Sequence, residues 1–456
     1  MIQRDLLLRF AAAIAAALPA TLTAQSGGSN QAPTPQQAGS LEERLRALET
    51  RLDAKESEMQ ALEKKLAAKS ETSKWYDRLT IRGYGQFRYT SLFNEDNTPN
   101  LNVPADRSIN EPESLYLRRG RVTLSGDVSD RVYFYAQTEF AGTPNGLSDW
   151  TMQMRDYYTD IALDQDKESR LRVGLSKVPY GFVNLQSSQN RIALERADAI
   201  NSAVEGERDM GVYYFWAPSH IRDLFRDLVR SGRKGSGDYG VLGFGAFTGQ
   251  GPNRSDKNGD VHIAARASYP FQFGDGQVVE IGVQGYTGEY VVTTSSMQLN
   301  PSPAPAQAAP TADGGGIDDE RVAASVIVYP APIGFEAEWT WGKSPQLSDD
   351  LSRINAESIQ GGYVQAHYML ETEAGVWFPF VRWNFFDGAR KFATNAPKDE
   401  VNELDIGFEW QATPEIEVTM QYTHTFWRTD TSDTSGTPFE EARDVDRFGI
   451  QMQVNF

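Results

Sequence analysis

Phe448-Gly-Ile-Gln-Met-Gln-Val-Asn-Phe456, at the C-terminal end of the chain, places an apolar side chain at every second position. Gly, Gln, Gln and Asn fill the positions between them. Successive side chains of a β-strand point to opposite faces, so this stretch predicts a strand with one apolar face and one polar face. Working backwards along the chain, the same period of two persists as far as Leu79.

Strand-like segments and their connections alternate in a regular way over this region. Sixteen segments can be counted, beginning near residues 79, 115, 131, 155, 170, 209, 238, 260, 276, 320, 333, 359, 376, 403, 415 and 446. The tight connections are Gly126 to Asp130, Asp164 to Ser169, Pro330 to Pro332, Glu371 to Gly375 and Ala412 to Pro414. The connections between them run from roughly ten to thirty residues, a pattern typical of outer-membrane barrels. Pro218 to Gly237 is an exception, long and basic, which indicates either a small helix or an error in the count.

The charged face of these strands decides between a barrel and a soluble fold. Arg131, Tyr133 and Glu139 alternate with apolar residues in the third strand, and a charge facing hydrocarbon would cost roughly 2 to 4 kcal/mol near the membrane midplane. The charged face must therefore line a closed, water-filled lumen. A soluble sandwich would give the same alternation, but it would not explain the alternating connections or the aromatic residues at strand ends. Those residues are Tyr76, Tyr89, Trp341, Trp377, Trp383 and Phe426.

We therefore predict an all-β fold, a 16-stranded antiparallel transmembrane β-barrel over residues 75–456, preceded by a signal peptide and a short coiled coil. Arg4 and Arg9 precede the apolar run 10–18 and a group of small residues, which is typical of a cleavable export signal over residues 1–24 rather than of a short buried helix. No other run approaches the roughly 20 apolar residues of a spanning helix. The expected location is the bacterial outer membrane, reached through the periplasm.

The segment between the signal and the barrel has two parts. Residues 25–40 contain no large apolar side chain and are rich in Gly, Ser, Pro and Gln, which predicts a flexible linker. Residues 41–70 carry a heptad seam in which Lys55 is the one polar position. The apolar seam residues are Leu41, Leu45, Leu48, Leu52, Met59, Leu62 and Leu66. So narrow a stripe favours self-association, but it leaves two strands and three strands both open.

Composition excludes several functions. The formal net charge of -18 argues against nucleic acid as a partner, because phosphate backbones require a basic surface. The chain has no cysteine, so neither disulfides nor thiolate metal sites are expected. None of the four histidines lies beside a nucleophile motif, and no H-E-x-x-H, Walker or dinucleotide pattern is present. We expect neither an enzyme nor a cofactor or metal; the expected partners are membrane lipid, small anionic or polar solutes, and further copies of the chain.

Strand parity assigns cationic side chains to the lumen, mainly on the early strands. They are Arg82, Arg88, Arg119, Arg121, Arg131, Arg170, Arg172, Arg266 and Arg382. Lumen-facing acids lie chiefly on later strands and are Glu336, Glu338, Glu403, Asp405, Glu409, Glu415 and Glu417, with Asp156 and Asp160 earlier. This distribution predicts a field across the pore and a wall that attracts anions. The same residues could instead neutralise one another across the lumen.

Several motifs resemble the phosphate-selective porin O and P family. They are Arg118-Arg119, Lys177-Val-Pro-Tyr-Gly181, Glu195-Arg196, Arg208-Asp-Met-Gly-Val212, AFTGQGPN at 246–253 and GGYVQAHYML at 361–370. The resemblance extends over the whole predicted barrel. It implies a trimeric sixteen-stranded porin with an N-terminal coiled coil, passive diffusion of small hydrophilic solutes, and anions such as phosphate among them. It also implies that Pro179 to Glu207 folds inward and narrows the pore.

The family associates anion selectivity with basic residues, which match here at Arg119, Arg121, Lys177, Arg191, Arg196 and Arg208. The chain departs from the pattern at residues 292–320, which contain no Lys or Arg and whose Pro, Ala and Gly content predicts a disordered extracellular flap. Two alternatives to an anion channel therefore remain. One is a general or weakly selective porin, and the other is a structural or adhesive barrel without a channel.

Overall fold

The computed structural model describes residues 46, 50–52, 54–59, 74–93, 113–141, 151–296, 304–307, 315–432 and 438–456. The chain divides into two compact units, Met1–Ser73 and Lys74–Phe456. In the first unit the described residues are helical, whereas the predicted signal peptide and linker lie outside the described residues. The pairing of this helix in a coiled coil stays a prediction. Among the described residues, no helix combines the length and hydrophobicity needed to cross a membrane.

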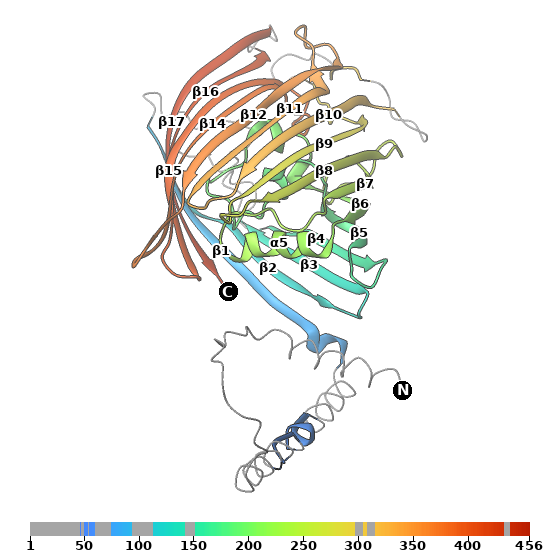
Figure 1. Cartoon of the computed structure of the whole chain (residues 1–456). Helices are drawn as coiled ribbons and strands as arrows, with labels where there is room; N and C mark the ends of the chain where they lie inside the picture. The colour runs from blue at the N-terminus through green and yellow to red at the C-terminus, as the bar shows by residue number, and fades with distance from the viewer. Residues whose placement is uncertain are drawn as a thin grey trace, which may run out of the picture. The chain divides into compact units, whose positions relative to one another are not determined.

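The second unit is a closed antiparallel barrel (Figure 1). Strands that follow one another in the chain pair with each other, except that β12 and β13 both pair with β14, and β1 also pairs with β17, which closes the sheet. The strands are β1 (Leu79–Leu92), β2 (Glu113–Asp127), β3 (Val132–Ala141), β4 (Thr151–Ala162), β5 (Ser169–Lys177), β6 (Arg208–Trp216), β7 (Leu242–Phe247), β8 (His262–Gln272), β9 (Val278–Tyr290), β10 (Ile317–Val328), β11 (Ile333–Leu347), β12 (Ile354–Tyr368), β13 (Leu370–Thr372), β14 (Gly375–Ala389), β15 (Lys398–Gln411), β16 (Ile416–Ser432) and β17 (Pro438–Asn455).

The barrel wall has sixteen strands, as predicted, although seventeen are labelled. β12 and the three-residue β13 both pair with β14 and are separated only by Met369, so together they count as one strand of the barrel wall. Four of the predicted long connections are shorter than ten residues, namely residues 142–150, 348–353, 390–397 and 433–437. The strands are longer than the apolar alternation indicates, because the backbone hydrogen bonds between strands continue beyond the apolar band, where the side chains are polar. For example, Ser432 of β16 still pairs with Pro438 of β17.

The two faces of the barrel differ as the alternation predicts. On β9 the side chains of Ile281 and Val283 are each 52% exposed and point outward, whereas Glu280 and Gln284 are 1% and 2% exposed and point into the lumen. An apolar outer face suits lipid, and the polar inner face is covered by other parts of the chain rather than by an apolar core.

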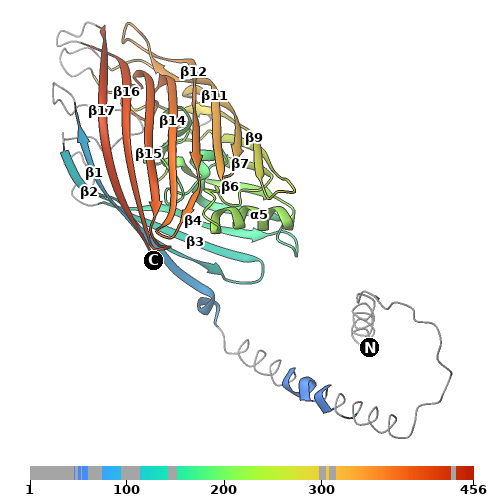
Figure 2. The ribbon, with the colours of Figure 1, turned by 60° about the vertical axis from the view of Figure 1, so that its left-hand side comes forward.

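Two connections fold into the lumen or against one end of it. The inner loop, Val178–Glu207, carries α3 (Phe182–Leu185), α4 (Asp198–Asn201) and η2 (Glu205–Glu207). The connection between β6 and β7 carries α5 (Ser219–Arg230), which confirms the predicted small helix. Figures 1 and 2 show α3 and α4 within the ring of strands and α5 at one end of it. A short 3-10 helix, η1 (Trp75–Arg78), precedes β1.

Candidate functional site

The inner loop is held on one side by acids of the later strands. Glu338 on β11 accepts hydrogen bonds from the backbone N–H groups of Phe182 (2.7 Å) and Val183 (3.3 Å). The chain enters this turn through Gly181, whose φ of 83° favours glycine and where a Cβ atom would lie 2.5 Å from Ile200. Glu338 therefore positions the start of the loop and does not face open water.

A second anchor holds the other half of the inner loop. The Arg321 guanidinium on β10 donates to the carbonyl of Ala199 (3.2 Å), and the Lys391 ammonium donates to that of Ala203 (2.7 Å). Both cations lie beside the buried carboxylate of Asp319, which ion-pairs with Lys391 and accepts a hydrogen bond from the Tyr286 hydroxyl (3.0 Å). Lys391 belongs to the connection between β14 and β15, so it joins an outer connection to the inner loop.

Towards the early strands, the inner loop meets arginines. Glu195 pairs with Arg88, Arg118 and Arg119 from β1 and β2. Burial alone would raise the pKa of the Glu195 carboxyl, but these guanidinia, above all Arg118, outweigh burial and hold that pKa well below its usual range. Glu195 is thus a buried carboxylate that binds the loop to the wall.

Glu207 forms a similar centre at the end of the loop. Its carboxylate lies 2.8 Å from Arg196, 2.7 Å from Arg208 and 3.5 Å from Arg155. Here too the cations, Arg196 first, outweigh burial and hold the pKa of Glu207 well below its usual range. Arg208 in turn binds Asp156 at 3.0 Å, which ties this centre to β4.

Two β-bulges bring extra arginines into the lumen. The register between β1 and β2 passes from Gln86 opposite Arg119 to Phe87 opposite Leu117, so Arg118 has no partner across the strand pair and turns inward beside Arg119. The register between β3 and β4 similarly skips Arg155. A bulge adds one residue to a strand and interrupts the alternation of its faces. Strict alternation would place Arg118 and Arg155 on the lipid side, so the sequence pattern alone does not assign them to the lumen.

These groups form one cationic cluster between the inner loop and the early strands. Seven arginines pair with four acids in it, and Lys177 and Arg191 lie beside them and donate to backbone carbonyls, so nine cationic side chains stand against four acids, an excess of five positive charges. The cations are Arg88, Arg118, Arg119, Arg121, Arg155, Lys177, Arg191, Arg196 and Arg208, and the acids are Glu139, Asp156, Glu195 and Glu207. The excess means that pairing within the described residues does not neutralise the cluster.

Arg191 is the member of the cluster with the least compensation. Its side chain is buried, and within the described part of the chain its Nε and Nη1 atoms have no hydrogen-bond partner. Burial, followed by the neighbouring Arg196 and Arg119, lowers the pKa of Arg191 well below its usual value. A buried donor without a partner is costly, so this position favours an anion that could accept hydrogen bonds from it.

The remaining predicted residues divide into two groups. Arg82, Arg131, Arg170 and Arg172 line a cavity of about 600 Å³ on the short-turn side of the inner loop. Arg266 and Arg382 lie on the far wall, where Arg266 pairs with Glu280 at 2.8 Å and Arg382 with Asp405 at 2.7 Å. Arg266 stays outside the cationic cluster, whereas Arg382 also donates to the backbone carbonyl of Glu195 at 2.6 Å and so borders the cluster.

The acids of the later strands are mostly engaged in structural contacts. Glu409 pairs with Lys234, and Glu403 and Asp405 accept hydrogen bonds from Asn384, at 2.9 and 3.4 Å. Glu415 lies in an exposed turn rather than in the lumen. The acidic wall therefore holds the inner loop and the segment after α5, while the positive charge on the early side stays in excess.

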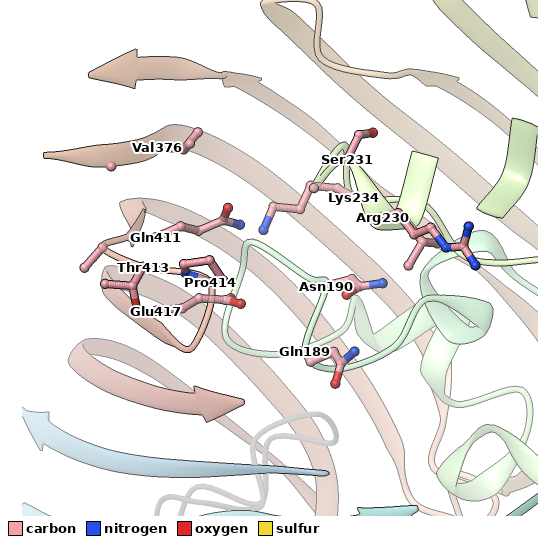
Figure 3. A pocket seen from close by; sticks show the side chains of 14 residues that line it. Gln189, Asn190, Arg230, Ser231, Lys234, Val376, Gln411, Thr413, Pro414 and Glu417 are labelled. Atoms are coloured by element: carbon pink, nitrogen blue, oxygen red, sulfur yellow. The ribbon is translucent and has the colours of Figure 1, made fainter. Parts of the chain in front are cut away.

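Helix α5 lies at the short-turn end of the barrel and borders two cavities. Val229 and Arg230 line both the 600 Å³ cavity and a second cavity of about 510 Å³ beside the turns at Gly375 and at 411–414. Figure 3 shows Lys234 extending toward Gln411 in this second cavity, whereas the Arg230 guanidinium points away from those turns. The C-terminal end of α5 thus divides the space behind the inner loop.

Comparisons with known proteins give one family match and a set of similar solved structures. Residues 99–456 match the family model described as phosphate-selective porin O and P. No sequence among the curated proteins matches the chain. Similar solved structures each cover 83% of the chain. They include the trimer form of the outer membrane protein OmpT of Vibrio cholerae (12% identity, all of that chain, TM-score 0.48), an anion-selective porin from Comamonas acidovorans (10%, 99%, 0.46) and the outer membrane channel DcaP of Acinetobacter baumannii (13%, 97%, 0.46).

Proposed function

Because the chain belongs to the phosphate-selective porin O and P family and has the fold of an outer-membrane porin, we propose that its lumen conducts small anions in preference to cations. The observation that carries this proposal is the excess of five positive charges in the cationic cluster. In a narrow passage with walls of low dielectric constant, such an excess concentrates anions and repels cations. Phosphate fits the cluster because guanidinium forks bind its oxygens in pairs.

The first test is the reversal potential of the purified protein in a planar bilayer under a gradient of KCl. We expect a potential whose sign shows chloride passing more easily than potassium, because the cationic cluster controls the passage. Phosphate titrated into the chloride solution should then reduce the current at concentrations well below that of chloride. A cation-selective channel would overturn the proposal, and near-zero conductance of the folded protein would favour a structural barrel.

Replacing Arg191 with glutamine should weaken the anion preference without closing the channel. The change removes one of the five excess charges, and at the effective dielectric of a protein interior we expect the anion-to-cation permeability ratio to fall by about two- to ten-fold. The matched control is Arg428→Gln, because Arg428 is a partly exposed arginine outside the lumen that pairs with Glu400. Equal ratios for the two variants would remove Arg191 from the selective site.

We further propose that the chain is exported by residues 1–24 and that the helix predicted over residues 41–70 joins three barrels. The heptad seam and the trimer form of the similar OmpT structure support a homotrimer. Conductance steps that arrive in groups of three are the expected result. Deletion of residues 41–70 should shift the protein toward monomers in a sedimentation experiment, and steps that always arrive singly would contradict a trimer.

A further inference from the structure

The 600 Å³ cavity behind the inner loop has its own chemistry, and we call it the basic chamber. Its walls are the lumen faces of β1–β5, the inner loop at Leu185 and Ser187, and helix α5. It lies next to the cationic cluster, because Lys177 and Arg208 belong to both. A solute that passes the cluster toward the short-turn end therefore enters a space large enough for a whole small organic molecule.

Three guanidinium groups in the basic chamber are available to a solute. The side chains of Arg82, Arg131 and Arg230 line the cavity, and within the described residues none of them makes a side-chain hydrogen bond or an ion pair. The other arginines are occupied: Arg172 binds Asp160 at 2.7 Å, and Arg170 and Arg222 share Asp238 at 2.7 and 2.8 Å. The chamber thus combines a structural set of ion pairs with three unused cations.

Aromatic rings line the same chamber. Tyr135 and Tyr158 stack at a centroid distance of 5.0 Å, and the Arg172 guanidinium lies 3.8 Å from the centroid of Tyr158. Tyr133 is a neighbour of Asp160 across the strand pair and is only partly buried, and no ring contact to it occurs in the described part of the chain. Its ring therefore remains available for stacking beside Arg131, which lies on the same face two residues earlier in the chain.

Helix α5 gives the chamber a fixed wall. Its first residue, Ser219, donates from its backbone N–H to Glu168 at 2.7 Å, and Arg222 binds Asp238. On the opposite side of the helix, Leu228 packs with Phe182 of the inner loop and with Tyr329. These contacts fix α5 against both the barrel wall and the inner loop, so Arg230 is presented from a defined position.

We propose that the basic chamber binds organic anions that combine one aromatic ring with one or two carboxylates, and that it is a second binding site beyond the cationic cluster. Guanidinium forks suit carboxylates, and a tyrosine ring adds stacking that an inorganic anion cannot use. The volume separates this site from one for phosphate alone, because phosphate would fill only a small part of it. The inference rests on the proposed anion channel, since the ligand must first pass the cationic cluster.

The test compares two dianions of similar charge as blockers of the single-channel chloride current, phthalate with its ring and succinate without one. Each is added to one side of the bilayer and then to the other. The free energy of one aromatic pair corresponds to a difference of about three- to ten-fold, so we expect phthalate to block at a concentration lower than succinate by that factor. The larger effect should come from the side of the short turns. Equal block by the two anions from both sides would overturn the proposal.

Variants locate the block within the channel. Tyr133→Leu should abolish the advantage of phthalate over succinate, whereas Tyr157→Leu should preserve it, because Tyr157 lies on the outer face of β4 and is 54% exposed. Arg131→Gln should weaken block by both dianions about equally, and it keeps the test valid if Tyr133→Leu does not form barrels. Loss of the phthalate preference in Tyr157→Leu as well would contradict the assignment to the chamber.

The reversal potential separates this inference from the function on which it rests. A cation-selective wild-type channel would refute the proposed function itself. An anion-selective channel with no preference for phthalate would refute only the basic chamber as a site for aromatic carboxylates. Both measurements use the same preparation of the full chain.

Discussion

Replacing Glu195 with glutamine is expected to loosen the inner loop and, at the same time, to strengthen the preference for anions. Glu195 is the acid that compensates Arg88, Arg118 and Arg119, and all four groups are largely buried. Removing one partner of a buried ion pair typically costs about 3 to 5 kcal/mol, because the remaining charges lose their counter-charge. The charge excess of the cationic cluster also rises by one.

Two measurements check this expectation. The midpoint of unfolding should fall, and the open-channel current should become noisier as the inner loop samples more positions, while the reversal potential moves further toward chloride. Glu415→Gln is the matched control, because Glu415 lies in an exposed short turn outside the lumen. An unchanged unfolding midpoint together with quiet currents would show that the arginines do not depend on Glu195.

Much of the barrel could be predicted from the sequence because the alternation of side chains is a local property. The pattern at 448–456 needs only the two-residue repeat of a strand, and β17 covers it as far as Asn455. The same repeat placed Arg121 and Arg172 correctly in the lumen. The ends of strands were less predictable, because the backbone ladder of β16 and β17 continues where the side chains no longer alternate between apolar and polar.

The cationic cluster was only partly predictable because bulges and long-range contacts are not local. Arg118 and Arg155 enter the lumen through bulges, and a bulge is visible only when two strands are paired. A pair of adjacent charged residues, such as Arg118-Arg119 within an otherwise alternating strand, was the signal that could have indicated one. The contact of Lys391 with Asp319 joins positions 72 residues apart, and nothing in either stretch predicts it.

The field across the lumen stays a prediction, and the contacts of the charged side chains show what the sequence pattern leaves out. Parity placed Glu338 and Glu409 on the later side, opposite the early arginines. It could not show that these acids would be used by the chain itself, Glu338 by the backbone of the inner loop and Glu409 by Lys234. The folded connections therefore cover the acids and leave the cations in excess, and that excess is what supports an anion channel.

Replacing Asp319 with asparagine is expected to release the other half of the inner loop and to raise the conductance. Asp319 is fully buried beside Lys391 and Arg321, which hold the carbonyls of Ala203 and Ala199. Without the carboxylate, two buried cations lose their counter-charge, at a cost of about 3 to 5 kcal/mol, and their positions relative to the loop are no longer fixed. The segment around α4 should then move, and the passage beside it should widen.

A neighbouring residue provides a matched control for Asp319→Asn, and the place of Asp319 in the lumen distinguishes its effect from that of Glu195→Gln. Asp318→Asn changes the neighbouring residue, which is exposed on the outer face of the same strand, and should leave conductance unchanged. Because Asp319 lies away from the cationic cluster, Asp319→Asn should increase conductance with a smaller shift in reversal potential than Glu195→Gln. If both variants changed selectivity equally and neither changed conductance, the inner loop would not be the element that sets the width of the passage.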